Sequence, residues 1–371
     1  IYAACCDCHR PTNPLSLMPL VAHTELPTFL RLQEEGEDIL NANRASHQHI
    51  RELHIGFLNI MPDAALEATE RQFFRLVGAC NQIAQFHIHP FTISGLPRSE
   101  SAQAHIDQYY ETFEQLQIDG LDALIISGAN VTHAHLQDED FWQPLTEVFE
   151  WAQENVTSTL CSCLASHAFV QHFYQLERTR LAHKCWGVYS HKLVNRMHPL
   201  VAEINTRFDV PHSRFNQLAE QDLIALGIQP LVTSAEAGVH LAVSPDGFRT
   251  VLFQGHPEYD AISLLKEYKR EVLRYINQDI DQYPPLPEHY FNAEVQAIFH
   301  QHAQQLIQAL KDNTELPTFP EASIISQLDN TWRDTAKAVF NNWLGKVYQI
   351  TNQDRRKPFM QGIDADNPLQ L

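Results

Sequence analysis

Long apolar runs are missing from this sequence. None approaches the roughly 20 residues that a membrane-spanning helix needs, so no such helix is predicted. The segment from Ile1 to Leu15 also lacks the long apolar core of a secretory signal. The chain has seven cysteines, an odd number, which argues against a disulfide framework. We therefore expect a cytoplasmic protein whose thiols are reduced.

Positive charge is also scarce. Lys and Arg number 26 against 45 Asp and Glu, which gives a formal net charge of −19 with neutral His. This balance argues against sequence-independent nucleic-acid binding, which depends on Lys and Arg at phosphates. A local basic pocket for an anionic ligand is still compatible with it.

Four potential metal ligands crowd into the first residues: Cys5, Cys6, Cys8 and His9. Their spacing lacks the two-residue gap that usually lets two thiolates converge on zinc, so no metal site is predicted there. We interpret residues 1–20 as a disordered tail, translated from an upstream region, with the true start near Met18. Residues 21–371 are interpreted as a single folded domain.

The central part of the chain alternates between strand-like and helix-like patterns. Short apolar runs predict buried strands at 53–61, 121–128, 157–161, 231–234, 239–243 and 250–254. Helical spacing of apolar residues predicts helices at 66–77, 141–154, 164–176 and about 261–277. This order predicts an α/β fold, a mainly parallel sheet with helices on both faces. Pro-rich breaks then flank a helix at 293–310, and a last helix at 332–350 completes a helical C-terminal extension packed on the main domain.

In such folds functional residues lie where strands end and helices begin, which singles out Cys163. It stands between a predicted strand and a predicted helix, where unpaired N–H groups and the helix dipole favour a thiolate. Cys161, two residues earlier, is a rival that should point to the same side. Both could instead be small buried hydrophobic residues, as most free cysteines are.

Gly255-His-Pro-Glu-Tyr-Asp260 closes the last predicted strand. His256 and Glu258 project to the same side of extended backbone, so the carboxylate can orient the imidazole as a base for a cysteine. Other charged groups are candidates for substrate binding only if the substrate has charged ends. They are Lys184, Arg270 and the turn expected at Pro211-His-Ser-Arg214.

Together these residues resemble the homoserine O-succinyltransferase family, a branch of the class I glutamine amidotransferase-like fold. The resemblance runs from Glu25-Leu-Pro to Tyr348-Gln-Ile-Thr351, over nearly the whole chain. The matching stretches in between are Arg44-Ala-Ser, Leu58-Asn-Ile-Met-Pro62, Thr69-Glu-Arg-Gln-Phe73, Val156-Thr-Ser-Thr-Leu160, Gly187-Val-Tyr189, Pro211-His-Ser-Arg214, Gly255–Asp260 and Asn342-Trp-Leu344.

The resemblance implies a ping-pong acyltransferase of methionine biosynthesis, with no permanently bound cofactor and with succinyl-CoA or acetyl-CoA as co-substrate. It implies that Cys163 carries the acyl group, that His256 oriented by Glu258 is the base, and that L-homoserine is the acceptor. It assigns substrate binding to Lys184, Ser213 and Arg270, places Ser213 where acceptor specificity is influenced, and implies a homodimer.

Three departures from the family pattern stand out. The segment after Met61-Pro62 is longer and lacks the usual lysine, which leaves the oxyanion hole and the acceptor pocket open. A helical insertion around 290–326 has no family counterpart. Thr132 stands where succinyl-using members have glycine and acetyl-using members glutamate. Because Thr132 carries no charge to repel a succinyl carboxylate, we favour succinyl over acetyl as the donor group.

Two other classes of function stay open. A glutamine amidotransferase-like hydrolase has a similar Cys–His–Glu arrangement, but Cys163 precedes Leu-Ala instead of a glycine-rich turn, and no ammonia-accepting synthetase domain is present. A metal- or thiol-binding protein is the least favoured, because the 21 histidines are scattered without close ligand spacing. We expect no metal in the site.

Overall fold

A computed structural model describes residues 20–48, 50–80 and 84–371. Within these residues the chain forms one sheet whose 11 strands are β1 (Leu20–Ala22), β2 (Ile39–Asn41), β3 (Glu52–Leu58), β4 (Gln85–Phe91), β5 (Ala123–Ile126), β6 (Ser158–Ser162), β7 (Thr179–Leu193), β8 (Arg207–Gln217), β9 (Gln229–Ser234), β10 (Gly238–Val243) and β11 (Thr250–Phe253). Their order is β2-β1-β4-β3-β5-β6-β11-β10-β9-β7-β8.

The sheet has a parallel and an antiparallel part. All neighbours from β2 to β11 pair parallel, whereas β11, β10, β9, β7 and β8 pair antiparallel. The predicted α/β class with a mainly parallel sheet is thus confirmed, and all six predicted strands are present. Strands β1, β2, β4, β7 and β8 were not predicted. Pro211–Arg214, expected as a turn, lies inside β8, so that expectation is wrong.

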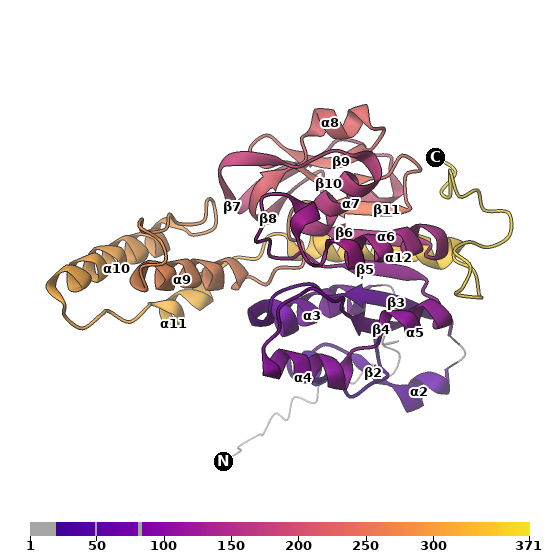
Figure 1. Cartoon of the computed structure of the whole chain (residues 1–371), viewed down its shortest axis with the longest axis horizontal. Coiled ribbons are helices and arrows are strands. Elements are labelled where there is room, and N and C mark those ends of the chain that lie inside the picture. Colours follow the sequence, from indigo (N-terminus) through magenta and orange to yellow (C-terminus); the bar gives the residue numbers. More distant parts are fainter. Residues whose placement is uncertain (1–19, 49, 81–83) are drawn as a thin grey trace, which may run out of the picture.

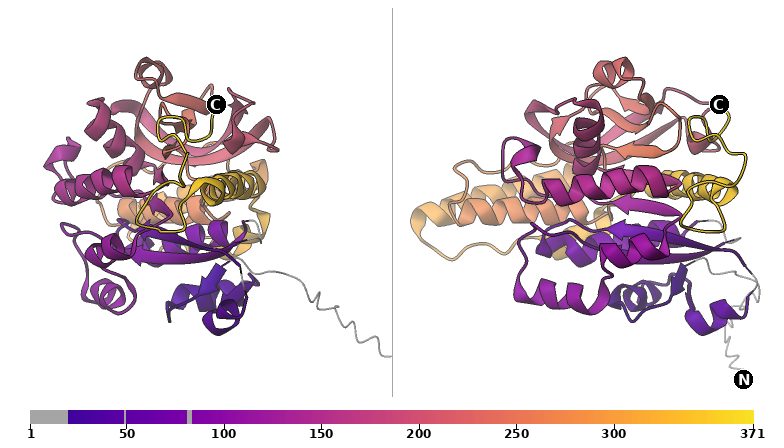
Figure 2. Two further views of the ribbon diagram at one scale, coloured as in Figure 1. Left: turned by 90° about the vertical axis from the view of Figure 1, so that its right-hand side faces the viewer. Right: turned by 45° about the vertical axis from the view of Figure 1, so that its right-hand side comes forward.

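Helices cover both faces of the sheet, as predicted. One core cluster buries apolar residues of α1 (Pro27–Glu34), α3 (Asp63–Gly78) and α12 (Arg333–Ile350). The opposite cluster buries residues of α5 (Phe113–Asp119), α6 (Trp142–Asn155), α7 (Leu164–Tyr174) and α8 (Glu220–Ala225). Figure 2 shows the sheet between α12 on one side and α6 on the other. Short helices α2 (Ala42–Ser46) and α4 (Glu100–Tyr109) lie near the β2 end.

The C-terminal helices divide between the core and a projecting arm. Helices α9 (Ser263–Ile276), α10 (Ala293–Asp312) and α11 (Glu321–Ile324) extend from one end of the sheet (Figure 1). They share a third core cluster in which Tyr268 of α9 packs against Phe299 of α10, with ring centroids 5.0 Å apart. The predicted helices at 293–310 and 332–350 correspond to α10 and α12. Within this arm, α10 and α11 pack against α9.

Two expectations concern the start of the chain and membranes. The interpretation of residues 1–20 as a tail, with Cys5, Cys6, Cys8 and His9, lies outside the described residues except for Leu20, which begins β1. Among the helices that the structure describes, none has both the length and the apolar character for a membrane span.

Candidate active site

Cys163 occupies a strained turn between β6 and α7. It is the residue before the first turn of α7 and adopts φ 51° and ψ −107°, a backbone conformation that residues with a Cβ rarely adopt. Its N–H donates to the Phe253 carbonyl at 2.7 Å, which ties the turn to β11. Its side chain is partly exposed. A strained strand–nucleophile–helix turn of this kind presents the side chain beside the unpaired N–H groups of a helix start.

Cys161 is in a different environment from Cys163. It is fully buried within β6, and burial raises the pKa of its thiol far above the ordinary value. A thiol that stays protonated and inaccessible is a poor nucleophile. Of the two cysteines left open on spacing, Cys163 has the geometry for chemistry and Cys161 that of a core residue.

His256 and Glu258 form a buried pair just after β11. His256 Nδ1 and Glu258 Oε1 are 2.8 Å apart, and the His256 ring stacks on Tyr259 with centroids 4.3 Å apart. Burial alone would lower the pKa of His256. The Glu258 carboxylate and the Cys163 side chain outweigh it and raise that pKa well above the ordinary value. The imidazole therefore faces both the predicted nucleophile and its orienting acid.

The loop that carries this pair is held from two sides. At Gly255 a Cβ would come within 2.7 Å of Val210 Cγ1 and 2.8 Å of His212 Nε2, so only glycine fits against β8 there. The His256 N–H also donates to the Pro211 carbonyl at 2.8 Å. This close approach at Gly255 and the His256 N–H bond hold His256 against β8.

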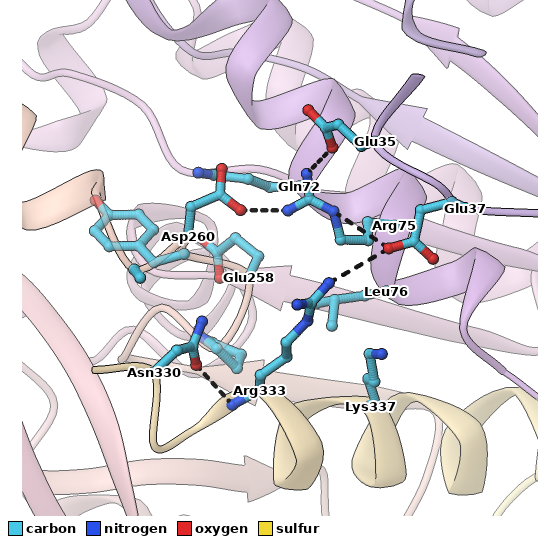
Figure 3. Close-up of a pocket in the computed structure, with 13 residues that line it drawn as sticks. Glu35, Glu37, Gln72, Arg75, Leu76, Glu258, Asp260, Asn330, Arg333 and Lys337 are labelled. Carbon is cyan, nitrogen blue, oxygen red and sulfur yellow. Dashed lines mark hydrogen bonds and ion pairs between the residues drawn. The ribbon is translucent and has the colours of Figure 1, made fainter. Parts of the chain in front are cut away.

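Asp260 anchors the other end of the loop to α3. Its carboxylate accepts from Arg71 Nη2 at 2.9 Å. It also pairs with Arg75, which in turn pairs with Glu35 (Figure 3). The Asp260 side chain does not cap the following helix, because α9 starts after Ile262 without a side-chain cap bond. A cavity of about 340 Å³ lies behind the loop, lined by Glu258, Arg75 and Arg333 among others.

Glu267 of α9 gathers several of the expected substrate-binding residues. It accepts from the Ser213 hydroxyl at 2.6 Å, from Trp186 Nε1 at 3.0 Å and from the Tyr259 hydroxyl at 2.7 Å. Lys184 Nζ lies 3.6 Å from Glu267 Oε2, the oxygen that also accepts from Ser213 and Trp186. Sequence reasoning missed Glu267, since nothing in the sequence showed that β7, β8 and α9 meet there.

The charges of this group are balanced. Burial would raise the pKa of Glu267, but Lys184 and the Ser213 and Tyr259 donors outweigh it and hold that pKa below its usual value. Burial lowers the pKa of Lys184, and Glu267 opposes that shift. Lys184 Nζ also lies over the Trp186 ring, 4.1 Å from its centroid. The result is a desolvated ion pair next to His256, whose charge also acts on Glu267.

Arg270 lies three residues after Glu267, so the two side chains share a face of α9. Its side chain is 59% exposed, and its Nε is 3.8 Å from Glu271 Oε1. Its charge contributes to lowering the pKa of Lys184. The structure thus brings Lys184, Ser213 and Arg270 to one side of the His256 pair.

Thr132 lies at a separate cavity of about 610 Å³. Its N–H donates to Glu139 Oε1 at 2.6 Å and its hydroxyl to Glu139 Oε2 at 3.1 Å. The same cavity is lined by Arg178 and Arg180, and Arg178 is close enough to Cys163 for the two to interact electrostatically. Sequence reasoning missed both arginines, because Arg180 lies at the start of the unpredicted strand β7 and Arg178 directly precedes it.

The segment after Met61-Pro62 forms the first turns of α3. Arg98 Nη1 donates to the Met61 carbonyl at 2.6 Å and lies 3.3 Å from Asp63 Oδ1. A Cβ at Gly128 would meet the Cys163 Cβ at 3.6 Å and Met61 Sδ at 3.7 Å. Gly128 and Met61 therefore flank the nucleophile.

Comparison with known proteins gives a consistent result. The family model described as homoserine O-succinyltransferase matches residues 19–353. A protein named homoserine O-succinyltransferase from Methylobacter tundripaludum is 68% identical over 354 residues, covering 95% of this chain and 100% of that protein. A protein of the same name from Methylococcus capsulatus is 65% identical over the same coverage of both chains.

Solved structures show weaker likeness. A glutamine amidotransferase from Thermotoga maritima has 12% identity and a TM-score of 0.41, covering 81% of this chain and 99% of that one. A glutamine amidotransferase from Methylobacillus flagellatus has 12% identity and a TM-score of 0.44, covering 80% and 95%.

Proposed function

Because the chain belongs to the homoserine O-succinyltransferase family, we propose that it transfers the succinyl group of succinyl-CoA to the hydroxyl of L-homoserine. The observation that carries this proposal is the strained turn that presents Cys163 to the His256–Glu258 pair. A cysteine, a base and an orienting carboxylate in this order support covalent acyl transfer.

In the first half-reaction, the Cys163 thiolate attacks the thioester carbonyl of succinyl-CoA. The oxyanion is positioned near the N–H groups of Leu164 and Ala165, which have no carbonyl four residues earlier in the helix to bond. Collapse breaks the bond to the CoA sulfur, which leaves with the proton of the His256 imidazolium. Cys163 now carries a succinyl thioester, and His256 is neutral.

In the second half-reaction, the homoserine hydroxyl attacks that thioester while His256 Nε2 accepts its proton. Acylation has removed the Cys163 charge, which is one of the causes of the raised pKa of His256. Its pKa is therefore lower at this stage than in the resting enzyme, and more of the imidazole is neutral and able to accept a proton. Expulsion of the Cys163 thiolate releases O-succinylhomoserine and restores the imidazolium–thiolate pair.

The group around Glu267 suits the amino-acid end of homoserine. A buried carboxylate can hold an ammonium group, and Lys184 and Arg270 can hold a carboxylate. These three side chains come from β7 and α9, beside His256. Ser213, bonded to Glu267, fixes that carboxylate in place.

The cavity at Thr132 suits the donor. Thr132 directs its hydroxyl to Glu139, so it does not offer that proton to a succinyl carboxylate. Arg178 instead supplies a positive charge on the Cys163 side of the cavity. We assign the distal carboxylate of the succinyl group to Arg178, with Thr132 shaping the space for the acyl chain.

The test is CoA release by the purified protein, with succinyl-CoA or acetyl-CoA crossed against L-homoserine or L-serine. We expect the succinyl-CoA and homoserine pair to be fastest. Cys163→Ser should lower the rate by about 10³-fold or more, whereas Cys161→Ser, the matched control, should retain activity. Acid quench after succinyl-CoA alone should leave a succinyl adduct on Cys163. If acetyl-CoA is used faster, the donor assignment is wrong; glutaminase activity without any CoA release would replace the proposal by a hydrolase.

A further inference from the structure

We propose that His23, His89 and Glu111 form a binding site for a divalent transition-metal ion of the zinc type. Each of these side chains offers one ligand atom, and the three atoms lie within 4.8 Å of one another. Ligands of one tetrahedral zinc are about 3.3 Å apart, so shifts of roughly 1 Å would close the site. No step of the proposed acyl transfer involves these residues.

The sheet brings these residues together from distant parts of the sequence. His89 and His87 are two residues apart in β4 and project from the same face, and His54 of β3 pairs with His87. His23 directly follows β1, the other neighbour of β4, and Glu111 is paired with Phe91 at the end of β4. This is why the sequence showed no close ligand spacing.

The strongest sign of a ligand is an unused lone pair on His23. His23 Nδ1 lies 3.2 Å from the Val21 carbonyl, to which it can only donate, so Nε2 carries no proton. That Nε2 is buried and has no hydrogen-bond partner, and the same holds for His87 Nε2. The rings of His23 and His87 are 5.2 Å apart, which makes His87 the candidate for a fourth ligand.

A chain of hydrogen bonds orients the second imidazole. His89 Nδ1 is 2.6 Å from Glu111 Oε1, and His89 Nε2 is 2.8 Å from His54 Nδ1. With an ion on Nδ1, His89 Nε2–H donates to His54, whose own Nε2 lies 3.4 Å from Glu52 Oε2. Metal-binding histidines are commonly fixed by such a bond from the other ring nitrogen.

The donor atoms and nearby charges suit a divalent cation. Arg355 lines a neighbouring pocket together with His54 and Glu52. The nearby Arg355 charge opposes a cation, and the carboxylates of Glu111 and Glu52 offset it. Two imidazoles and a carboxylate are donors that zinc accepts readily.

The position of the site indicates a structural role. His89 pairs with Gly56, and the register leads from there through Leu124 to Thr159, four residues before Cys163. Three strand spacings and four residues along a strand amount to roughly 20 Å between the site and the nucleophile. An ion there would join β1 and β4 to the segment at Glu111 without touching the acyl chemistry.

The experiment uses full-length protein, freed of metal with a chelator and titrated with Zn²⁺ by calorimetry and with Co²⁺ by visible absorption. We expect one ion per chain, a tetrahedral Co²⁺ spectrum, and a thermal midpoint raised by roughly 3–5 °C at a hundredfold excess over Kd. His23→Ala and Glu111→Gln should each weaken binding by at least about tenfold while CoA release continues.

His300→Ala, an exposed histidine of α10, is the matched control and should bind as the unaltered protein does. His23→Ala and Glu111→Gln are both used so that a folding defect in one does not decide the result; acyltransfer activity reports folding. Absence of binding, or binding that survives both substitutions, overturns the proposal. Survival would place the ion elsewhere, such as the exposed Glu236, Glu288 and His289 group or the first residues of the chain.

Discussion

At the scale of single residues, the charges around His256 determine its pKa and therefore when it can act as a base toward the proposed acyl-enzyme. Burial pushes its pKa down, whereas Glu258 and Cys163 push it up by more. A histidine with a raised pKa is protonated at neutral pH, so its base form appears only as the pH rises through that pKa. The deacylation step needs this base form, which makes the step sensitive to pH.

Glu258→Gln keeps the shape of the side chain but removes the charge. The pKa of His256 should fall, and the rising limb of kcat with pH should move to lower pH. Because a neutral amide orients and stabilises the imidazolium poorly, kcat itself should fall by about 10²- to 10⁴-fold. The measurement is kcat against pH at saturating substrates, from about pH 5.5 to 9. A limb that stays at the same pH in the variant would contradict the role of Glu258.

Arg178 should distinguish the two acyl donors. If its guanidinium binds the distal succinyl carboxylate, Arg178→Gln loses a charge-assisted hydrogen bond of about 1.5–3 kcal/mol, or roughly 10- to 150-fold in kcat/KM for succinyl-CoA. The value for acetyl-CoA, which has no such carboxylate, should change little. Arg270→Gln is the control and should affect homoserine instead. An equal loss for both donors would assign Arg178 to the CoA part.

At the scale of elements, the loop after β11 is placed by its contact with β8. Gly255→Ala puts a methyl group 2.8 Å from His212 Nε2, so the loop must move and carry His256 with it. We expect kcat to fall at least about tenfold and unfolding free energy to drop by about 1–3 kcal/mol. Gly345→Ala in α12, where nothing lies within 4 Å, is the control and should be neutral or stabilising. Unchanged kcat in Gly255→Ala would show that the close contact does not position His256.

The elements also explain what the sequence could and could not predict. Cys163, His256 and Glu258 follow strands that are short and fully buried and have β-branched and apolar residues at their centres, so both the strands and their ends could be predicted. Strand β7 begins with mostly exposed and polar residues, which do not give an apolar run. Its register with β8 decides where Lys184 and Ser213 meet Glu267. That meeting depends on pairing between distant segments, and no local pattern reveals it.

At the scale of the whole molecule, the site lies where the two kinds of pairing meet. Strand β11 pairs parallel with β6 and antiparallel with β10. The parallel part supplies Cys163 at the end of β6, and the antiparallel part supplies Lys184 and Ser213 from β7 and β8. His256 follows the strand between them. The proposed acyl carrier and the proposed acceptor-binding groups thus come from different parts of one sheet, and the strand pairing fixes their relative positions.

The same region buries neutral histidines, and this predicts how the fold responds to acid. Burial lowers the pKa of His167 to about 3 and of His191 to about 4, and holds those of His212 and His240 well below the ordinary value. In the unfolded chain all four bind protons near pH 6.5, so unfolding takes up protons below that pH. Each should lower the unfolding free energy by about 1 kcal/mol between pH 6.5 and 5.5, roughly 4 kcal/mol together.

Urea unfolding at pH 7.5, 6.5 and 5.5 measures this fall. His256, whose pKa is raised, loses its stabilising contribution only as the pH rises above 6.5, so it does not cancel the fall on the acid side. His240→Gln should reduce the fall by about 1 kcal/mol, because one proton-binding group is gone from the unfolded chain, whereas the exposed His300→Gln should leave it unchanged. A fall in unfolding free energy of less than about 1 kcal/mol would mean that these histidines bind protons in the folded state. Their burial would then not exclude water from this part of the sheet.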